Sequence, residues 1–239
     1  MIERFSASQV ARHMQCHASA DLGSAIPNWQ PPGEDPTKDN AANRGTNMHE
    51  IAERIGEELT PKEMAGFGRA IEYVGELRQR RRFTFLREAS IKATWLESEP
   101  DTTADVVLYT KDELHIVDYK FGKIPVEAVG NPQLLYYAAC FAGLAPKAKG
   151  AELHIVQPFA DNITSWYVTA AEIQRFMDEA IVHERAIQAG DRSFGPSDEC
   201  KFCPANPHTR GDKGRPLCPA MMNLLYPSAG VDEEEMLNG

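Results

Sequence analysis

The strongest constraint on the fold is a pair of apolar segments separated by a short polar turn. The segment "ADVVLYT" covers residues 104–110, and "ELHIVDYKFG" covers residues 113–122. Both are rich in branched and aromatic residues, which is typical of β-strands. The two residues between them, Lys111-Asp112, predict a β-hairpin in which Thr110 pairs with Glu113. A four-residue loop from Thr110 to Glu113 preserves the same register.

This hairpin is predicted to bring two acids and an amine together. Side chains alternate along a strand, so Asp118 and Lys120 point to one face, and the register places Asp105 opposite Asp118. Two carboxylates about 5 Å apart repel each other unless a cation lies between them. A hard divalent metal ion suits such oxygen ligands, and Lys120 would orient a water or stabilise charge on a phosphate. A surface ion pair also explains Asp118 and Lys120, but it gives no reason for Asp105.

The rest of the chain is predicted to alternate helices with strands. Asn131 and Pro132 have the residue types of an N-cap and a first helical position, and the Pro- and Asn-rich residues 24–43 predict a loop. These patterns predict an α/β or α+β fold, with a mixed central β-sheet flanked by helices. We expect helices at 6–17, at 47–59 after a Thr46 N-cap, at 61–81, 131–144 and 170–189, and strands at 83–96, 104–110, 114–121, 151–159 and 165–170.

Composition limits the class of protein only broadly. The 239 residues suit one large domain, and the 42% apolar and 25% charged content is ordinary for a globular protein. No apolar segment has the length of a membrane helix and the N-terminus has no apolar h-region, so we expect a cytoplasmic protein. The net charge of −10 argues against binding nucleic acid through bulk charge. However, four acids lie in the tail at 232–235, and the basic run "LRQRRRF" at 77–83 is either a solvated helix end or a phosphate-binding patch.

Asp105 followed by Asp118-Tyr119-Lys120 resembles the signature of the PD-(D/E)xK nucleases, in particular their RecB-like branch. The resemblance spans roughly residues 44–140. It implies a restriction-endonuclease-like core in which both aspartates and the Tyr119 carbonyl hold Mg²⁺ or Mn²⁺, while Lys120 assists the water or the transition state. The family usually has a glycine shortly before the first acid, and this chain has Thr102 there, in "TTAD".

Two further motifs resemble those of the RecB-like branch. The branch commonly adds Gln-x-x-x-Tyr after the lysine strand, and Gln133 and Tyr137 stand in that place, where they share one helix face. Without the other motifs, Gln133 would be interpreted as a polar helix cap and Tyr137 as a core residue. The branch also uses an upstream histidine as a metal ligand, and "RGTNMHE" supplies His49 in the matching context, although lone helical histidines are often structural. Glu88, inside "FTFLREASI", is a candidate supporting carboxylate.

Four of the five cysteines indicate a metal or cluster site. Cys16 lies near the N-terminus, whereas Cys200, Cys203 and Cys218 lie near the C-terminus. A disulfide framework is improbable in a cytosolic chain, so these four thiols favour a bound metal. The fifth, Cys140, lies in the apolar run "YYAACFAGL" and is expected to be an inert core thiol.

One cysteine at the start and three near the end also resemble the iron–sulfur RecB-like exonucleases, including those of the CRISPR-associated and AddAB types. The resemblance implies a [4Fe–4S] cluster that joins residues 1–23 and 190–222 around a core of about 44–189, in one domain of 1–239 with a flexible tail at 228–239. Fourteen residues separate Cys203 from Cys218, which departs from the tighter family spacing. A structural Zn²⁺, with His208 or His17 replacing one cysteine, and unligated thiols are the alternatives.

The resemblance therefore implies a divalent-metal-dependent DNA exonuclease that hydrolyses phosphodiester bonds in recombination, repair or phage replication. We expect its partners to be DNA with a free end and a recombination or replication protein, with no membrane, and a phage or prophage origin fits the compact chain. The alternatives are a non-catalytic nucleic-acid- or protein-binding module with a degenerate nuclease fold, and a structure-specific endonuclease.

Overall fold

A five-stranded sheet lies at the centre of the protein, and its strands follow the order β1-β2-β3-β4-β5. The computed structural model describes residues 5–25, 61–206 and 217–225. β3 and β4 are parallel and the other neighbours are antiparallel, so the predicted mixed sheet is confirmed. The strands are β1 (Thr84–Lys92), β2 (Asp101–Tyr109), β3 (Leu114–Tyr119), β4 (Gly150–Gln157) and β5 (Asn162–Thr169).

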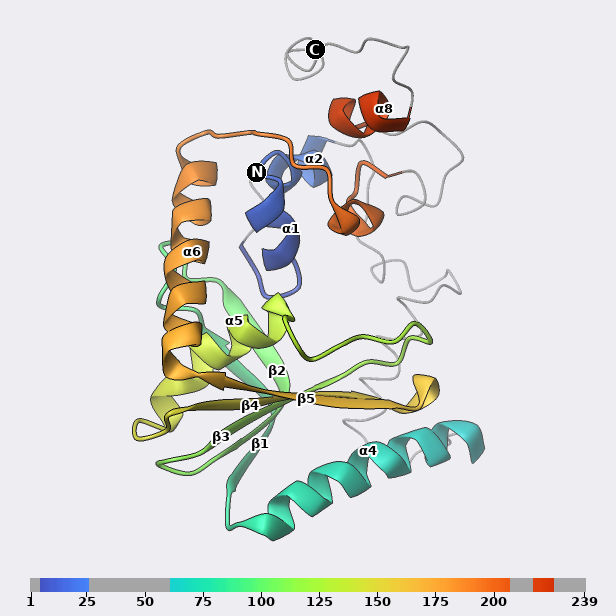
Figure 1. Cartoon of the computed structure of the whole chain (residues 1–239), viewed down its shortest axis with the longest axis vertical. Helices are drawn as coiled ribbons and strands as arrows, with labels where there is room; N and C mark the ends of the chain where they lie inside the picture. The colour runs from blue at the N-terminus through green and yellow to red at the C-terminus, as the bar shows by residue number, and fades with distance from the viewer. Residues whose placement is uncertain (1–4, 26–60, 207–216, 226–239) are drawn as a thin grey trace.

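Helices cover both faces of this sheet (Figure 1). One face packs against α4 (Pro61–Arg80), and the other packs against α5 (Pro132–Phe141) and α6 (Ala170–Gln188). None of the helices in the described ranges is long and apolar enough to cross a membrane. The remaining helical segments are α1 (Val10–Gln15), α2 (Ser19–Ala25), η1 (Ala142–Leu144), η2 (Pro158–Ala160), η3 (Asp198–Phe202) and α8 (Pro219–Leu225).

The local sequence explains where α5 and α6, which share one face of the sheet, begin. The side chain of Asn131 accepts hydrogen bonds from the backbone N–H groups of Gln133 and Leu134, and Pro132 follows it, so the predicted start of α5 is confirmed. α6 begins with a reciprocal capping box between Thr169 and Glu172. The expected helix at 47–59, the tail and nearly all of the expected loop at 24–43 lie outside the described residues.

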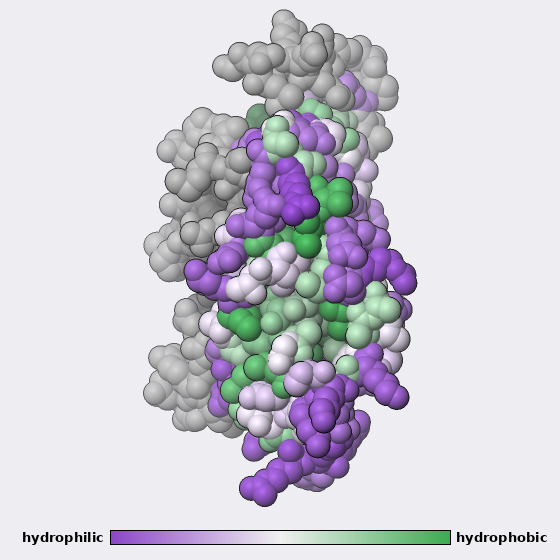
Figure 2. Space-filling model, turned by 90° about the vertical axis from the view of Figure 1, so that its left-hand side faces the viewer, coloured by the Kyte–Doolittle hydropathy of each residue, from purple (hydrophilic) through white to green (hydrophobic). Residues whose placement is uncertain are grey.

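Alternation along the central strand divides the apolar residues between two cores. Ile116 of β3 faces the larger core beneath α5 and α6, and Val117 faces the smaller core above α4. Because β3 is buried on both faces, its apolar run is nearly continuous. Figure 2 views the molecule from its α6 side and shows hydrophobic residues toward the middle of that face, between hydrophilic ones at its two ends.

The two ends of the described chain pack together beyond α5 and α6 (Figure 1). The N–H of Ala18 donates to the carbonyl of Ser193 at 3.2 Å, and Arg12 Nη1 donates to the carbonyl of Phe202 at 3.2 Å. Gly195 lies so close to α1 that an added Cβ would be 1.8 Å from the carbonyl oxygen of Gln15. Only glycine allows this approach of the two backbones.

Candidate active site

The β2–β3 hairpin has the predicted register. At the end of the ladder Val106 pairs with Val117, and one step further Asp105 lies opposite Asp118. At this step the backbone N–H of Tyr119 donates to Oδ2 of Asp105 at 2.6 Å. A side-chain carboxylate therefore accepts the hydrogen bond where the regular ladder between the two strands ends.

A third acid lies in the same row of the sheet. The β1–β2 pairs on either side of Glu88 place it opposite Asp105, so Glu88, Asp105 and Asp118 lie side by side on three adjacent strands. Glu88 has a φ of +43°, in the left-handed region that residues other than glycine adopt infrequently. Strained backbone of this kind often accompanies a functional site.

The electrostatics of this row favour a bound cation. Burial raises the pKa of Asp105 well above its usual range, and the negative charge of Asp118 raises it further. Asp118 is itself only 4% exposed. Its Oδ2 has no hydrogen-bond partner of normal geometry within the described chain, although Lys120 Nζ lies 2.9 Å away. If both carboxyl groups are ionised, the single lysine neutralises only one of them, so a bound cation would stabilise the second negative charge.

Lys120 connects this row to α5. Its Nζ donates to Oε1 of Gln133 at 2.8 Å, and Nε2 of Gln133 donates to the hydroxyl of Tyr137 at 2.9 Å. Burial raises the pKa of Tyr137, so its phenol stays protonated at neutral pH. The structure thus brings together Asp118, Lys120, Gln133 and Tyr137, which the sequence had grouped as candidate site residues. His49 lies outside the described residues.

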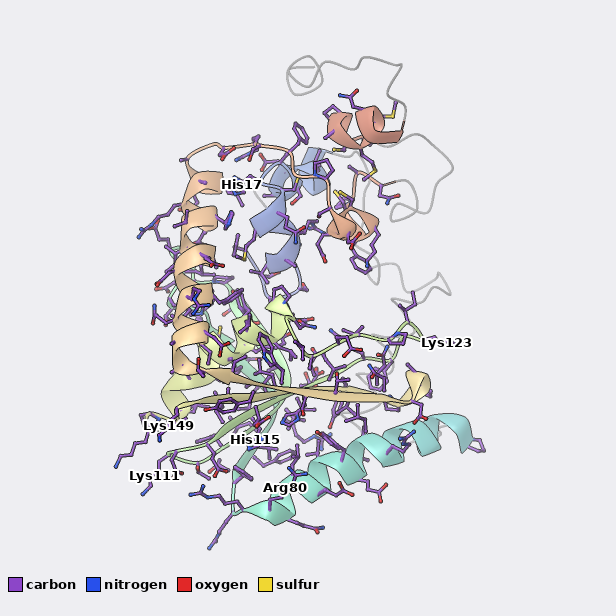
Figure 3. All side chains as sticks on the ribbon, in the orientation of Figure 1. His17, Arg80, Lys111, His115, Lys123 and Lys149 are labelled. Atoms are coloured by element: carbon purple, nitrogen blue, oxygen red, sulfur yellow. The ribbon has the colours of Figure 1, made fainter. Side chains whose placement is uncertain are left out.

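A buried glutamine that the sequence did not single out holds the loop that follows Lys120. Nε2 of Gln157 donates to the carbonyls of Gly122 and Ile124 at 3.0 and 2.7 Å, and its Oε1 accepts from the N–H of Val126 at 3.0 Å. Gln157 has 0% exposure and ends an apolar strand immediately before a proline. This isolated amide at the end of β4 was the only signal of its role in the sequence. Figure 3 shows Lys123 of this loop at the opposite end of the sheet from Lys111.

The four candidate cysteines line a single cavity between the two ends of the chain. Cys16, Cys200, Cys203 and Cys218 border a space of about 20 Å³. Burial raises the pKa of Cys203 to about 11 and also raises the pKa of Cys218, so both thiols stay protonated unless a cation binds. Cys140 lies elsewhere, with the indole N–H of Trp95 at 3.4 Å from its sulfur. Cys140 is half-buried and packs against the larger core, which agrees with an inert thiol.

His17 is not among the residues that line this cavity, and Figure 3 shows it near the upper end of α6. Its Nδ1 lies 2.8 Å from Oδ2 of Asp191, and its Nε2 lies 2.8 Å from Nδ1 of His183. Both ring nitrogens are therefore engaged with partners on or near α6. His208, the other histidine considered as a zinc ligand, lies outside the described residues. In the described part of the chain, no three His, Cys, Asp or Glu side chains are gathered closely enough to enclose a metal ion as they stand.

Comparison with known proteins places most of this chain in one family. Residues 84–229 match the model of a family described as a protein of unknown function, DUF2800. This region contains the whole sheet and three of the four candidate metal-binding cysteines. Among solved structures, the crystal structure of SSO0001 is similar over 82% of this chain and 81% of that chain, with 14% sequence identity and a TM-score of 0.36. That likeness is too distant to indicate a function.

Proposed function

We propose that this chain, which belongs to the DUF2800 family of proteins of unknown function, is a divalent-metal-dependent deoxyribonuclease with a PD-(D/E)xK core of the RecB-like branch. The observation that carries the proposal is the grouping of Asp105, Asp118 and Lys120 where the β2–β3 ladder ends. Asp105 lies opposite Asp118, and Lys120 Nζ is 2.9 Å from Asp118 Oδ2. An acid pair can hold a divalent ion, and an adjacent amine can act on the water or the phosphate, so this arrangement can support metal-assisted phosphodiester hydrolysis.

The donor set fits a hard divalent ion. Asp105 and Asp118 would hold Mg²⁺ or Mn²⁺, together with the carbonyl of Tyr119, with His49 proposed as a further ligand. The buried Oδ2 of Asp118, which has no hydrogen-bond partner of normal geometry among the residues that the structure describes, supports this assignment. When bound, such an ion supplies an activated water and neutralises charge on the scissile phosphate.

Lys120 is held in place by α5, because its Nζ donates to Gln133, and Gln133 in turn contacts Tyr137. An ammonium positioned in this way stabilises the negative charge that develops on the phosphate oxygens, or orients the attacking water. Gln133 and Tyr137 act as positioning residues in this proposal. The three side chains form one hydrogen-bonded series that ends at Lys120 beside Asp118, so movement of α5 would displace the amine.

We further propose that the enzyme is an exonuclease acting on DNA with a free end in recombination, repair or phage replication. The cysteine site (Cys16, Cys200, Cys203 and Cys218) would hold a structural [4Fe–4S] cluster, with Zn²⁺ as the alternative. The common cavity of these thiols, between segments from the two ends of the chain, supports a joining role. The hydrolysis itself transfers no electrons.

The first test is metal-dependent cleavage of end-labelled single-stranded, double-stranded and circular DNA. We expect the wild-type protein to degrade linear DNA with Mg²⁺ or Mn²⁺ and not with EDTA. Asp118→Asn and Lys120→Ala should each lower the rate by about 10²–10³-fold, because each removes a group that acts on charge in the transition state. Asp112→Asn, at the half-exposed tip of the same hairpin, is the matched control and should retain full activity.

Cleavage of circular DNA would identify an endonuclease instead. DNA binding without cleavage by the wild-type protein would indicate a non-catalytic module, and normal rates in Asp118→Asn and Lys120→Ala would remove both residues from the mechanism. Thermal melting of each variant separates loss of catalysis from loss of folding.

A further inference from the structure

A second cavity adjoins the row of acids on the α4 side of the sheet. It measures about 220 Å³ and lies between α4 and β1. Its lining includes Ile71, Gly75 and Arg78 of α4, together with Phe85, Glu88 and Asp105 of the sheet. Because Glu88 and Asp105 belong both to this lining and to the row of acids, a ligand in the cavity would lie next to the proposed metal site.

The side chains around the cavity combine apolar, aromatic and cationic groups. The guanidinium of Arg78 lies over the ring of Phe85, with its Cζ 4.5 Å from the ring centroid. Ile71 is 46% exposed, and Arg78 and Arg87 are also exposed, so the rim is accessible from solvent. Aromatic rings and arginine planes are the surfaces on which unpaired bases stack, and arginines at the rim suit the flanking phosphates.

We propose that this cavity binds one unpaired nucleobase of the DNA strand whose neighbouring phosphate lies at Asp105 and Asp118. The inference rests on the proposed nuclease function and adds a substrate-binding subsite to it. Pockets for drug-sized molecules usually measure about 300–1,000 Å³, so this smaller space suits one heterocyclic ring system and not a base pair. A base that is stacked in a duplex cannot enter such a cavity until it is unpaired.

Two glycines on α4 allow a matched test of this subsite. An added Cβ at Gly75, which lines the cavity, meets no atom within 4 Å, and the same holds for Gly68, which does not line it. Because the first side-chain atom at Gly75 has space, the side chain of Gly75→Leu should extend into the cavity. Gly68→Leu is the control, because it makes the same change of helix propensity on the same element.

The experiment measures binding separately from cleavage. Fluorescence anisotropy is recorded with labelled oligothymidylate and with an abasic oligomer of the same length and charge, using Ca²⁺ in place of Mg²⁺. We expect the wild-type protein and Gly68→Leu to bind oligothymidylate about tenfold more tightly than the abasic oligomer, because stacking of one base contributes that much. Gly75→Leu should bind both oligomers with the same, weaker affinity.

Phe85→Leu, which removes the ring but keeps an apolar side chain, provides a second variant if Gly75→Leu does not fold. It should also lose the preference for oligothymidylate. An unchanged preference in the folded variants, or no preference in the wild-type protein, would overturn the subsite while metal-dependent cleavage leaves the nuclease proposal standing. A wild-type protein that neither binds nor cleaves DNA would overturn both.

Discussion

Asp118 and His154 are both buried ionisable side chains, but burial affects their charged forms in different ways. The carboxylate of Asp118 has a lysine 2.9 Å away and a second carboxylate opposite it. The imidazole of His154 is instead held neutral, because burial lowers its pKa to about 3. Its Nδ1 lies 2.9 Å from the hydroxyl of Tyr73, and its Nε2 lies 3.1 Å from Nδ1 of His115. Asp118 is therefore the proposed metal ligand, whereas the imidazole of His154 stays neutral.

His154 should make the protein less stable in acid. Between its unfolded pKa of about 6.5 and its folded pKa of about 3, the unfolded chain binds a proton that the folded chain does not. Stability therefore falls as the pH falls, and one residue contributes about 2 kcal/mol of loss between pH 7 and pH 5. Urea unfolding at both pH values should show this loss reduced in His154→Phe. The same pH dependence in both proteins would assign it to other groups.

At the scale of elements, the candidate active site is built from the strands β1, β2 and β3, from helix α5, and from the loop after Lys120. β1, β2 and β3 each contribute one acid, and α5 holds the lysine through Gln133. The loop after Lys120 is fixed by Gln157, which makes three hydrogen bonds to its backbone. These hydrogen bonds run from Gln157 at the end of β4 to the loop that follows Lys120. We therefore expect β4 to help to position Lys120.

Gln157→Leu should weaken both the fold and the proposed catalysis. It leaves two loop carbonyls and one N–H without their buried partner, which costs about 1–3 kcal/mol for each group that water cannot reach. We expect a lower melting temperature and slower DNA cleavage with little change in metal affinity. Gln174→Leu, on the exposed face of α6, is the control and should change stability by less than about 0.5 kcal/mol. Unchanged cleavage in a folded Gln157→Leu protein would show that the loop does not position Lys120.

At the scale of the whole molecule, two segments far apart in the sequence form the cysteine site. Cys16 comes from the segment after α1, and the other three cysteines come from the C-terminal segments around η3 and α8. Gly195 lets these segments approach, because its Cα lies against the backbone of Gln15. Close packing of the two backbones therefore brings the four thiols together, whether or not a metal is bound.

Gly195→Ala should disturb this join and reduce the bound metal. The new Cβ would be 1.8 Å from the carbonyl of Gln15, so the two segments must separate. After anaerobic purification we expect iron and a brown colour in the wild-type protein, and less iron and a lower melting temperature in Gly195→Ala. Gly143→Ala, where an added Cβ meets nothing within 4 Å, should match the wild type. Zinc in a colourless protein would support the alternative metal, and a metal-free protein would contradict both assignments.

The sequence alone was sufficient for the mixed sheet, the start of α5 and the register that puts Asp105 opposite Asp118. These features depend on neighbours along the chain: a short turn and a two-residue period leave one pairing that buries the apolar face. The resemblance to a nuclease signature likewise rested on short local motifs, such as Asp118-Tyr119-Lys120.

The tertiary structure decided how distant segments meet. It placed Glu88, which the sequence offered only as a candidate, opposite Asp105, and it brought Cys16 to the C-terminal cysteines as the resemblance implied. The burial of Gln157 against the loop and the cavity against α4 had no counterpart among the expectations from the sequence. Each of these contacts joins segments that the spacing of residues cannot relate. Their geometry follows from how whole elements pack, because close packing in three dimensions selects partners that no local periodicity encodes.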